Sequence, residues 1–255
     1  MDISLRTRRG PLPLQIILLI VWAVLLFGGY IFGRPNREEG RRMPLWTRMG
    51  ASLTLTAAAW LWRARAKDEP PAVRRLLTSL ATGMSLSTIG DFFMARLIVP
   101  GDNAVLGGMA SFGLGHIAYS LGILRFGNDN RLTRHRLPAL MGWWLFGLAS
   151  WLKIVWLPSS RREASHTVMD AAALPYALLL ATTAGAATGL ALNQRRFSGL
   201  ASGGVLFLLS DLILAGSIFS KWVFAGISDL IWLLYSPGQM LIVYTASVVL
   251  KSKDA

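Results

Sequence analysis

Three ionisable side chains lie inside long apolar segments of this chain: Asp91, His116 and Asp211. An ionisable group at membrane depth costs several kcal/mol unless it is paired or faces a polar cavity, so each of the three is a candidate for a functional site. Two carboxyl groups that share a buried site can be divided into an acid and a base, and an imidazole can relay protons between them. We therefore predict acid–base chemistry carried by Asp91, His116 and Asp211.

Further polar side chains accompany these three, and residues three, four or seven apart share one side of a helix. Tyr119 shares a face with His116, Ser210 lies at the edge of the face that carries Asp211, and Tyr235 and Gln239 share a face of the last span. We expect them to bind the substrate: Tyr119, Ser210, Tyr235, Gln239 and Arg96. Arg96 follows Asp91 by five residues and has two interpretations. Its long side chain can extend to the membrane interface, or its guanidinium group can bind a lipid phosphate.

Several other kinds of site are excluded by residue type. The chain contains no cysteine, so it has no thiolate nucleophile and no zinc–thiolate centre. The sequence has neither an HExxH metal motif nor a GxSxG serine-nucleophile motif. One histidine and two aspartates inside the apolar segments are too few for a zinc site. We predict no metal, and acid–base chemistry is what remains.

Composition indicates the environment that positions these residues. The 255-residue chain is 53% hydrophobic and 15% charged, with a mean hydropathy of +0.48. Apolar runs of about 20 residues recur along it, and a helix of that length crosses a hydrocarbon core of roughly 30 Å. The predicted fold is all-α: a polytopic transmembrane helical bundle of about eight spans, forming one integral membrane domain over residues 1–255.

The predicted spans cover residues 12–32, 45–61, 76–98, 104–124, 137–157, 168–192, 200–219 and 227–250. In this arrangement Asp91, His116, Asp211, Tyr235 and Gln239 fall at similar depths, within a slab on the order of 10 Å thick. We therefore expect the helices that carry them to form one cavity inside the membrane.

The net charge of +13 points to lipid headgroups. The basic residues lie mostly between apolar segments, as in loops that face anionic lipids, so no nucleic-acid partner is predicted. Eight spans place both termini on one side, and Lys and Arg are more frequent in the loops of that side. The expected location is the cell membrane, as a multi-pass protein with both termini in the cytoplasm. The arginine-rich connector 33–43 would then face outward, against the general tendency of Lys and Arg to lie in cytoplasmic loops.

Four segments resemble one known family. The chain reads GD at 90–91, GMASFGLGHIAY at 108–119, GGVLFLLSD at 203–211 and YSPGQMLI at 235–242. Together these segments are similar to the YhhN family, whose animal members are the TMEM86 lysoplasmalogenases. The resemblance covers roughly residues 76–250.

The resemblance implies a function for the aspartates. It suggests hydrolysis of the vinyl ether bond of a lysoplasmalogen to a fatty aldehyde and a glycerophospho-alcohol, with no cofactor. Protonation of the alkenyl carbon gives an oxocarbenium ion, so a general acid and a nearby carboxylate are required, as in glycoside hydrolysis. Asp91 and Asp211 would fill these roles in either order, and His116 would orient water or relay a proton.

Two alternatives stay open on the sequence. The same three residues could form a proton or solute pathway in a carrier or channel that is not an enzyme. An enzyme of this fold could also act on another ether or ester lipid. In both cases membrane lipid surrounds the site.

Overall fold

The structure is a computed structural model that describes residues 13–35, 41–160 and 168–251. Leu12, where the first predicted span begins, lies outside the described residues, as do both chain ends and residues 36–40 of the arginine-rich connector. Every secondary-structure element in the described part is a helix, and this part contains no β-sheet. This confirms the predicted all-α class.

The first helical rod runs from α1 (Pro13–Ala23) through a π-helical turn (Val24–Gly28) into α2 (Gly29–Phe32). It is followed by α3 (Leu45–Arg65), α4 (Pro71–Met94) and α5 (Asp102–Asp129). The next rod joins α6 (Arg136–Trp151), a second π-helical turn (Leu152–Trp156) and α7 (Leu157–Ser160). The last elements are α8 (Val168–Asn193), a 3₁₀ turn (Arg195–Phe197), α9 (Ser198–Phe219) and α10 (Ile227–Lys251). The described chain thus forms eight rods.

Six of the rods are long and apolar enough to cross a membrane by length and composition alone. The other two, α3 and α4, are just as long but carry more polar side chains. Their 21 and 24 residues correspond to roughly 30 and 36 Å of helix. Both pack inside the bundle, and several of their polar residues are buried there. The chain is a multi-pass membrane protein.

Several predicted spans and the corresponding helices have different ends, and α4 and α5 show the difference clearly. Helix α4 starts at Pro71 and stops at Met94, whereas the predicted span runs from 76 to 98. Arg96 adopts φ 58°, a left-handed conformation that ends the helix and turns the chain toward α5. At the other end of the bundle α5 continues to Asp129, beyond the predicted Leu124. Hydropathy marks the apolar part of a helix, but backbone hydrogen bonding continues past it into the polar interface.

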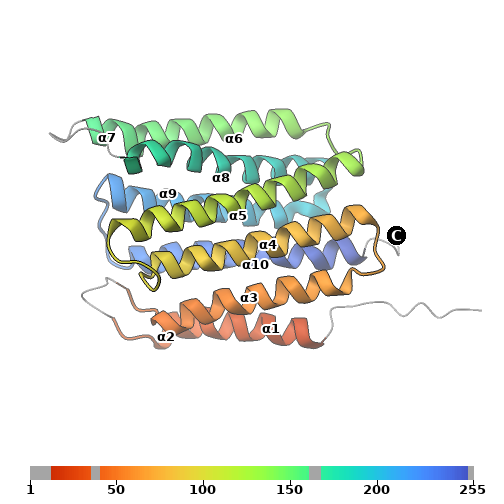
Figure 1. Ribbon diagram of the computed structural model, residues 1–255, viewed down its shortest axis with the longest axis horizontal. Helices are drawn as coiled ribbons and strands as arrows, with labels where there is room; N and C mark the ends of the chain where they lie inside the picture. Colours follow the sequence, from red (N-terminus) through yellow and green to blue (C-terminus); the bar gives the residue numbers. More distant parts are fainter. Residues whose placement is uncertain (1–12, 36–40, 161–167, 252–255) are drawn as a thin grey trace, which may run out of the picture.

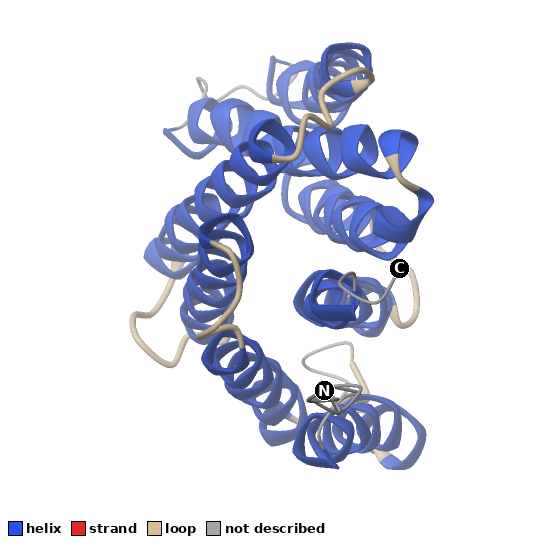
Figure 2. Ribbon diagram, turned by 90° about the vertical axis from the view of Figure 1, so that its right-hand side faces the viewer, coloured by secondary structure: helices blue, strands red, loops and turns tan. Residues whose placement is uncertain are grey.

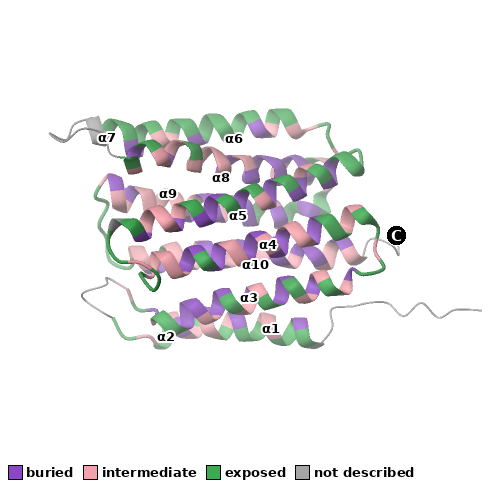
Figure 3. Cartoon of the chain, viewed as in Figure 1, coloured by how far each residue is buried: buried purple, intermediate pink, exposed green. Residues whose placement is uncertain are grey.

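The rods lie side by side with their axes nearly parallel or antiparallel (Figure 1). Helix α4 packs along α5, α9 along α10, and α6 along α8, while α3 joins α4 and α10. Viewed along the axes, the rods form a curved assembly rather than a single ring (Figure 2). Large exposed apolar side chains cover α6 and α1, and the buried residues lie mostly in α3, α4, α5, α8, α9 and α10 (Figure 3). The residues of interest lie in this inner group.

Close contact between α4 and α5 depends on two glycines. A Cβ atom at Gly83 would lie 2.3 Å from the ring of Tyr119, and one at Gly90 would lie 2.9 Å from the ring of Phe112. Only glycine leaves room for these aromatic rings against the backbone of α4. The rings in turn set the register of α5 beside Asp91.

Candidate functional site

Asp91 is the centre of a buried hydrogen-bond network that joins three helices. Its side chain on α4 is only 3% exposed. The Ser52 hydroxyl on α3 donates to Asp91 Oδ2 at 2.5 Å, and the Tyr235 hydroxyl on α10 donates to the same oxygen at 2.9 Å. Charge-assisted bonds of this kind offset the cost of burying a carboxylate.

The network continues from Tyr235 to α5. Gln239, one turn further along α10, donates from Nε2 to the Tyr235 hydroxyl at 3.5 Å. Its Oε1 accepts a 2.7 Å hydrogen bond from the Tyr119 hydroxyl. Tyr119 and Gln239 are fully buried. Asp91, Tyr119, Tyr235 and Gln239 were all predicted to belong to one site, and the structure brings the four together.

Asp211 occupies a second position with its own hydroxyl partners. The Tyr176 hydroxyl on α8 donates to Asp211 Oδ2 in a short hydrogen bond. Ser210 donates to Asp211 Oδ1 at 3.3 Å, but its hydroxyl also lies 2.6 Å from the carbonyl oxygen of Phe207. Ser210 therefore bonds mainly within its own helix. Phe112 links Asp211 to the Asp91 network, because its ring lines the same cavity as Asp211 and contacts the ring of Tyr235.

His116 lies in a third polar group and bonds neither aspartate within the described part of the chain. Its Nδ1 is 2.9 Å from the Thr183 hydroxyl on α8, which also contacts Ser120 at 2.9 Å. His116 Nε2 is buried without a hydrogen-bond partner among the described residues. The ring nitrogen can therefore bind a small polar molecule, such as water, that enters the site.

Aromatic rings join the polar group of His116 to the Asp91 network. The Phe207 ring centroid lies 4.3 Å from that of His116 and 5.1 Å from that of Tyr235. Phe112 completes the cluster, 5.9 Å from both Phe207 and Tyr235. The edge-to-face contacts hold the polar side chains in fixed orientations and keep their surroundings apolar.

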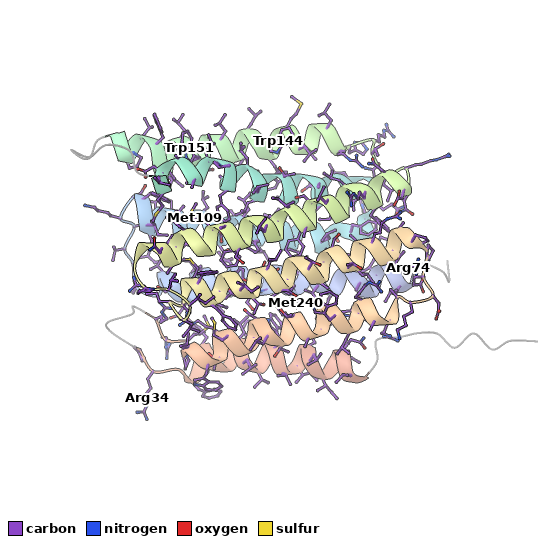
Figure 4. The ribbon with its side chains drawn as sticks, in the orientation of Figure 1. Arg34, Arg74, Met109, Trp144, Trp151 and Met240 are labelled. Carbon is purple, nitrogen blue, oxygen red and sulfur yellow. The ribbon has the colours of Figure 1, made fainter. Side chains whose placement is uncertain are left out.

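An apolar cavity adjoins this cluster between α5, α6, α8 and α9. Its cavity volume is roughly 90 Å³, and its wall is mostly aliphatic and aromatic. Asp211 is the only acidic residue that lines it among the described residues, and Tyr176 lines it as well. Met109 on α5 and Trp151 on α6 form parts of the wall (Figure 4). An apolar pocket with one or two polar groups is typical of a site for a largely hydrophobic ligand.

Asp91 does not line this cavity, although Met94, three residues further along the same face of α4, does. The two aspartates therefore differ in environment. Asp211 faces the space that a ligand can occupy, and Asp91 is enclosed by hydroxyl groups next to it.

Arg48 on α3 is a buried cation that we did not single out from the sequence. Its side chain is 5% exposed and lies over the Trp232 ring, with 5.5 Å from the guanidinium carbon to the ring centroid. It interacts electrostatically with Asp91. Arg48 precedes Ser52 by one helical turn, so both face the same carboxylate. An arginine inside the second predicted span was the signal that could have identified it.

Tyr176, Ser52 and Thr183 were also missed. Each is a single polar residue in an apolar segment, and such residues most often make local contacts. Pro175, inside α8, directly precedes Tyr176 and cannot donate a backbone hydrogen bond to that helix. That proline was the one local signal near Tyr176.

Arg96 lies apart from the network. It is exposed in the turn after α4 and does not line the apolar cavity. A contact between Arg96 and a lipid phosphate stays a prediction. No group of three or more His, Asp or Glu residues that could hold a metal ion occurs in the described ranges.

The fold and the site together define a polytopic helical membrane protein with a carboxylate-centred polar site beside an apolar cavity. The chain belongs to the YhhN family, which it matches over residues 43–246. That range contains every candidate site residue named above. No curated protein and no solved structure matches the chain.

Proposed function

We propose that the protein is an intramembrane hydrolase that cleaves the vinyl ether bond of lysoplasmalogens. The observation that carries the proposal is the position of Asp211, a carboxyl group on the wall of an apolar cavity with a second carboxyl group, Asp91, close by. The apolar wall of the cavity suits an alkenyl chain. The two carboxyl groups can supply the proton and the negative charge that the vinyl ether reaction requires. Membership of the YhhN family is consistent with this function.

The reaction needs one proton and one water molecule. A general acid protonates the second carbon of the alkenyl chain, and the adjacent carbon and oxygen become an oxocarbenium ion. Water adds to that carbon and returns a proton to the carboxylate. The resulting hemiacetal breaks its bond to the glycerol oxygen, which gives a fatty aldehyde and a glycerophospho-alcohol. Protons balance over the cycle, and carboxyl groups can supply both the acid and the stabilising charge.

The contrast between the two aspartates suggests their roles. Asp211 lines the cavity and can reach the alkenyl carbon, so we assign it the general acid. Both aspartates accept hydrogen bonds from two hydroxyl groups, but Asp91 also lies near the Arg48 guanidinium, whose positive charge can stabilise a carboxylate. We assign Asp91 the carboxylate that stabilises the oxocarbenium charge.

His116 is suited to water rather than to the lipid. It does not line the apolar cavity, and Nε2 has a free hydrogen-bonding position among the described residues. We infer that it holds the water molecule or relays its proton. The Thr183 contact at Nδ1 fixes the orientation of the ring.

A lipid substrate can approach from the side of the bundle. A shallow groove between α5 and α8 carries apolar residues such as Leu114 and Ile117, which are exposed where lipid would contact the protein. The groove and the cavity share Met109 and Tyr176 in their walls. Movement of these two side chains would connect the lipid phase to Asp211.

The decisive experiment compares two lysolipids with the same headgroup and chain length, one vinyl ether and one saturated ether. Purified protein should release aldehyde from the vinyl ether only. In D₂O the aldehyde, trapped by reduction, should carry one deuterium at its second carbon, because that proton comes from a solvent-exchangeable acid. Absence of aldehyde from every lysoplasmalogen tested would reject the proposal. A proton-flux assay in liposomes would then test the carrier or channel hypothesis.

A further inference from the structure

A strongly basic hollow lies at the opposite end of α4 from Asp91. Its lining comes from three helices: Arg63 of α3, Pro71, Arg74, Arg75, Thr78 and Ser79 of α4, and Gly122 and Arg125 of α5. It has a volume of roughly 380 Å³ and is open to the outside. Thr78 precedes Asp91 by 13 residues, or about 20 Å along the helix axis, so this is a separate site.

The arrangement of the basic hollow follows from helix geometry. Arg74, Arg75, Thr78 and Ser79 repeat at intervals of three and four residues, which places them on one face of α4. A Cβ atom at Gly122 would lie 2.5 Å from that of Ser79, so α5 approaches α4 closely at this level. That approach brings Arg125, one turn beyond Gly122, to the same hollow.

The positive charge of the basic hollow is only partly balanced. Arg75 forms an ion pair with Asp129 at 2.8 Å, and Arg63 donates to the Thr78 hydroxyl at 2.5 Å. The guanidinium groups of Arg74 and Arg125 make no hydrogen bond or ion pair with any residue that the structure describes. Four cations therefore face one carboxylate.

We propose that the basic hollow binds a phosphate group, and that its natural source is the headgroup of an anionic phospholipid. Guanidinium groups bind phosphate through paired hydrogen bonds, and the Ser79 hydroxyl adds a neutral donor. The first turn of α4 begins at Pro71, so the positive end of the helix dipole points to the same place. Arg74 lies near the end of the bundle, at the level expected for headgroups (Figure 4).

The test measures lipid binding by native mass spectrometry, which does not depend on any hydrolase activity. Wild-type protein is mixed with phosphatidylglycerol and phosphatidylcholine of equal chain length. Phosphatidylglycerol should be retained preferentially, because choline neutralises the phosphate of the other lipid. The double variant Arg74→Gln/Arg125→Gln should bind phosphatidylglycerol roughly 30-fold more weakly, and it leaves the Arg75–Asp129 ion pair intact.

The matched control is Arg134→Gln/Arg195→Gln. Both residues are exposed at the same end of the bundle but lie outside the basic hollow, so the control removes equal charge. It should bind phosphatidylglycerol like the wild type. A third variant, Arg74→Lys/Arg125→Lys, keeps the charge. Its affinity for phosphatidylglycerol should lie between those of the wild type and of Arg74→Gln/Arg125→Gln if the planar guanidinium group of arginine contributes paired hydrogen bonds.

Inorganic phosphate distinguishes the two sources. If it displaces phosphatidylglycerol only at a large excess, the site is built for a lipid headgroup. If inorganic phosphate alone binds as tightly, the phosphate site stands and its source is soluble. Equal weakening in both glutamine double variants would show a general charge effect and overturn the proposal. Equal retention of both lipids by the wild type would overturn it as well.

Discussion

The substitution Asp211→Asn tests the assignment of Asp211 as the general acid. Asparagine keeps the size of the side chain but cannot donate an acidic proton. Loss of a general acid typically costs about 10²- to 10⁴-fold in kcat, or roughly 3–5 kcal/mol of barrier. The Tyr176 hydroxyl can still donate to the amide oxygen, and the Ser210 hydroxyl, which faces the other carboxylate oxygen, keeps its 2.6 Å bond to the Phe207 carbonyl and can accept from the new NH₂ group. The free energy of unfolding should therefore change by less than about 1 kcal/mol.

Asp229, a buried aspartate away from the cavity, supplies a matched control. Asp229 accepts hydrogen bonds from the backbone N–H groups of Arg42 at 2.7 Å and Met43 at 3.1 Å, and it holds that segment against α10. In Asp229→Asn one N–H group must face an NH₂ group, which costs about 1–3 kcal/mol of stability. Asp229 does not line the cavity. Its variant should therefore lose thermal stability but keep kcat for each folded molecule.

The assay follows aldehyde release from a lysoplasmalogen in detergent micelles, and thermal unfolding reports on stability. The expected result is a crossover: Asp211→Asn loses turnover with little change in stability, and Asp229→Asn does the reverse. Asp91→Asn should also lose turnover. The double variant with Asp211→Asn should be little worse than either single variant, because residues that act as a unit are not additive. Full turnover in Asp211→Asn, or an equal loss of kcat in Asp229→Asn, would refute the reasoning.

Other predictions concern the route, the water, the headgroup and the orientation. A side chain at Gly113 would project toward Leu179 and Tyr176 in the groove, so Gly113→Leu should raise KM. The control Gly142→Leu, on open surface, should leave KM unchanged. Equal KM values for the two variants would exclude the groove as the route of the substrate. His116→Ala should lower kcat less than loss of either aspartate if it only orients water, and a loss as large as theirs would assign it proton transfer. Arg96→Lys should raise KM more than it lowers kcat if Arg96 contacts the lipid phosphate, and an unchanged KM leaves only the interfacial interpretation. The chain has no cysteine, so single cysteines can be introduced to report its orientation. Asp102→Cys should react with an impermeant thiol reagent in intact cells, and cysteines introduced near either terminus should not. The reverse pattern would invert the predicted orientation.

The fold class could be predicted because it depends on properties of single segments. Transfer of an apolar helix into lipid is favourable whatever its neighbours are, so hydropathy alone identified a helical membrane protein. The same argument singled out Asp91, His116 and Asp211, because a carboxyl or imidazole group at membrane depth is costly on any helix. Helical periodicity then correctly grouped Tyr235 with Gln239 on one face.

The partners of these residues could not be predicted, because they come from helices far apart in the sequence. Ser52 and Tyr235 reach Asp91 from positions 39 and 144 residues away. Periodicity gives the face of a helix but not the neighbour that the face meets. That choice depends on the fit between helix surfaces, such as the contact of the Tyr119 ring with Gly83.

The amino-acid sequence by itself thus determined the environment of the chain and the residues that the environment makes costly. Only the tertiary structure decided that the two aspartates differ: Asp211 faces an apolar cavity, and Asp91 lies among hydroxyl groups near Arg48. It also placed Arg96 in the exposed turn after α4, because the helix ends before it. The physical reason is that the cost of burying a group is a property of that group, whereas compensation for the cost depends on which partners the packed helices bring within hydrogen-bonding distance.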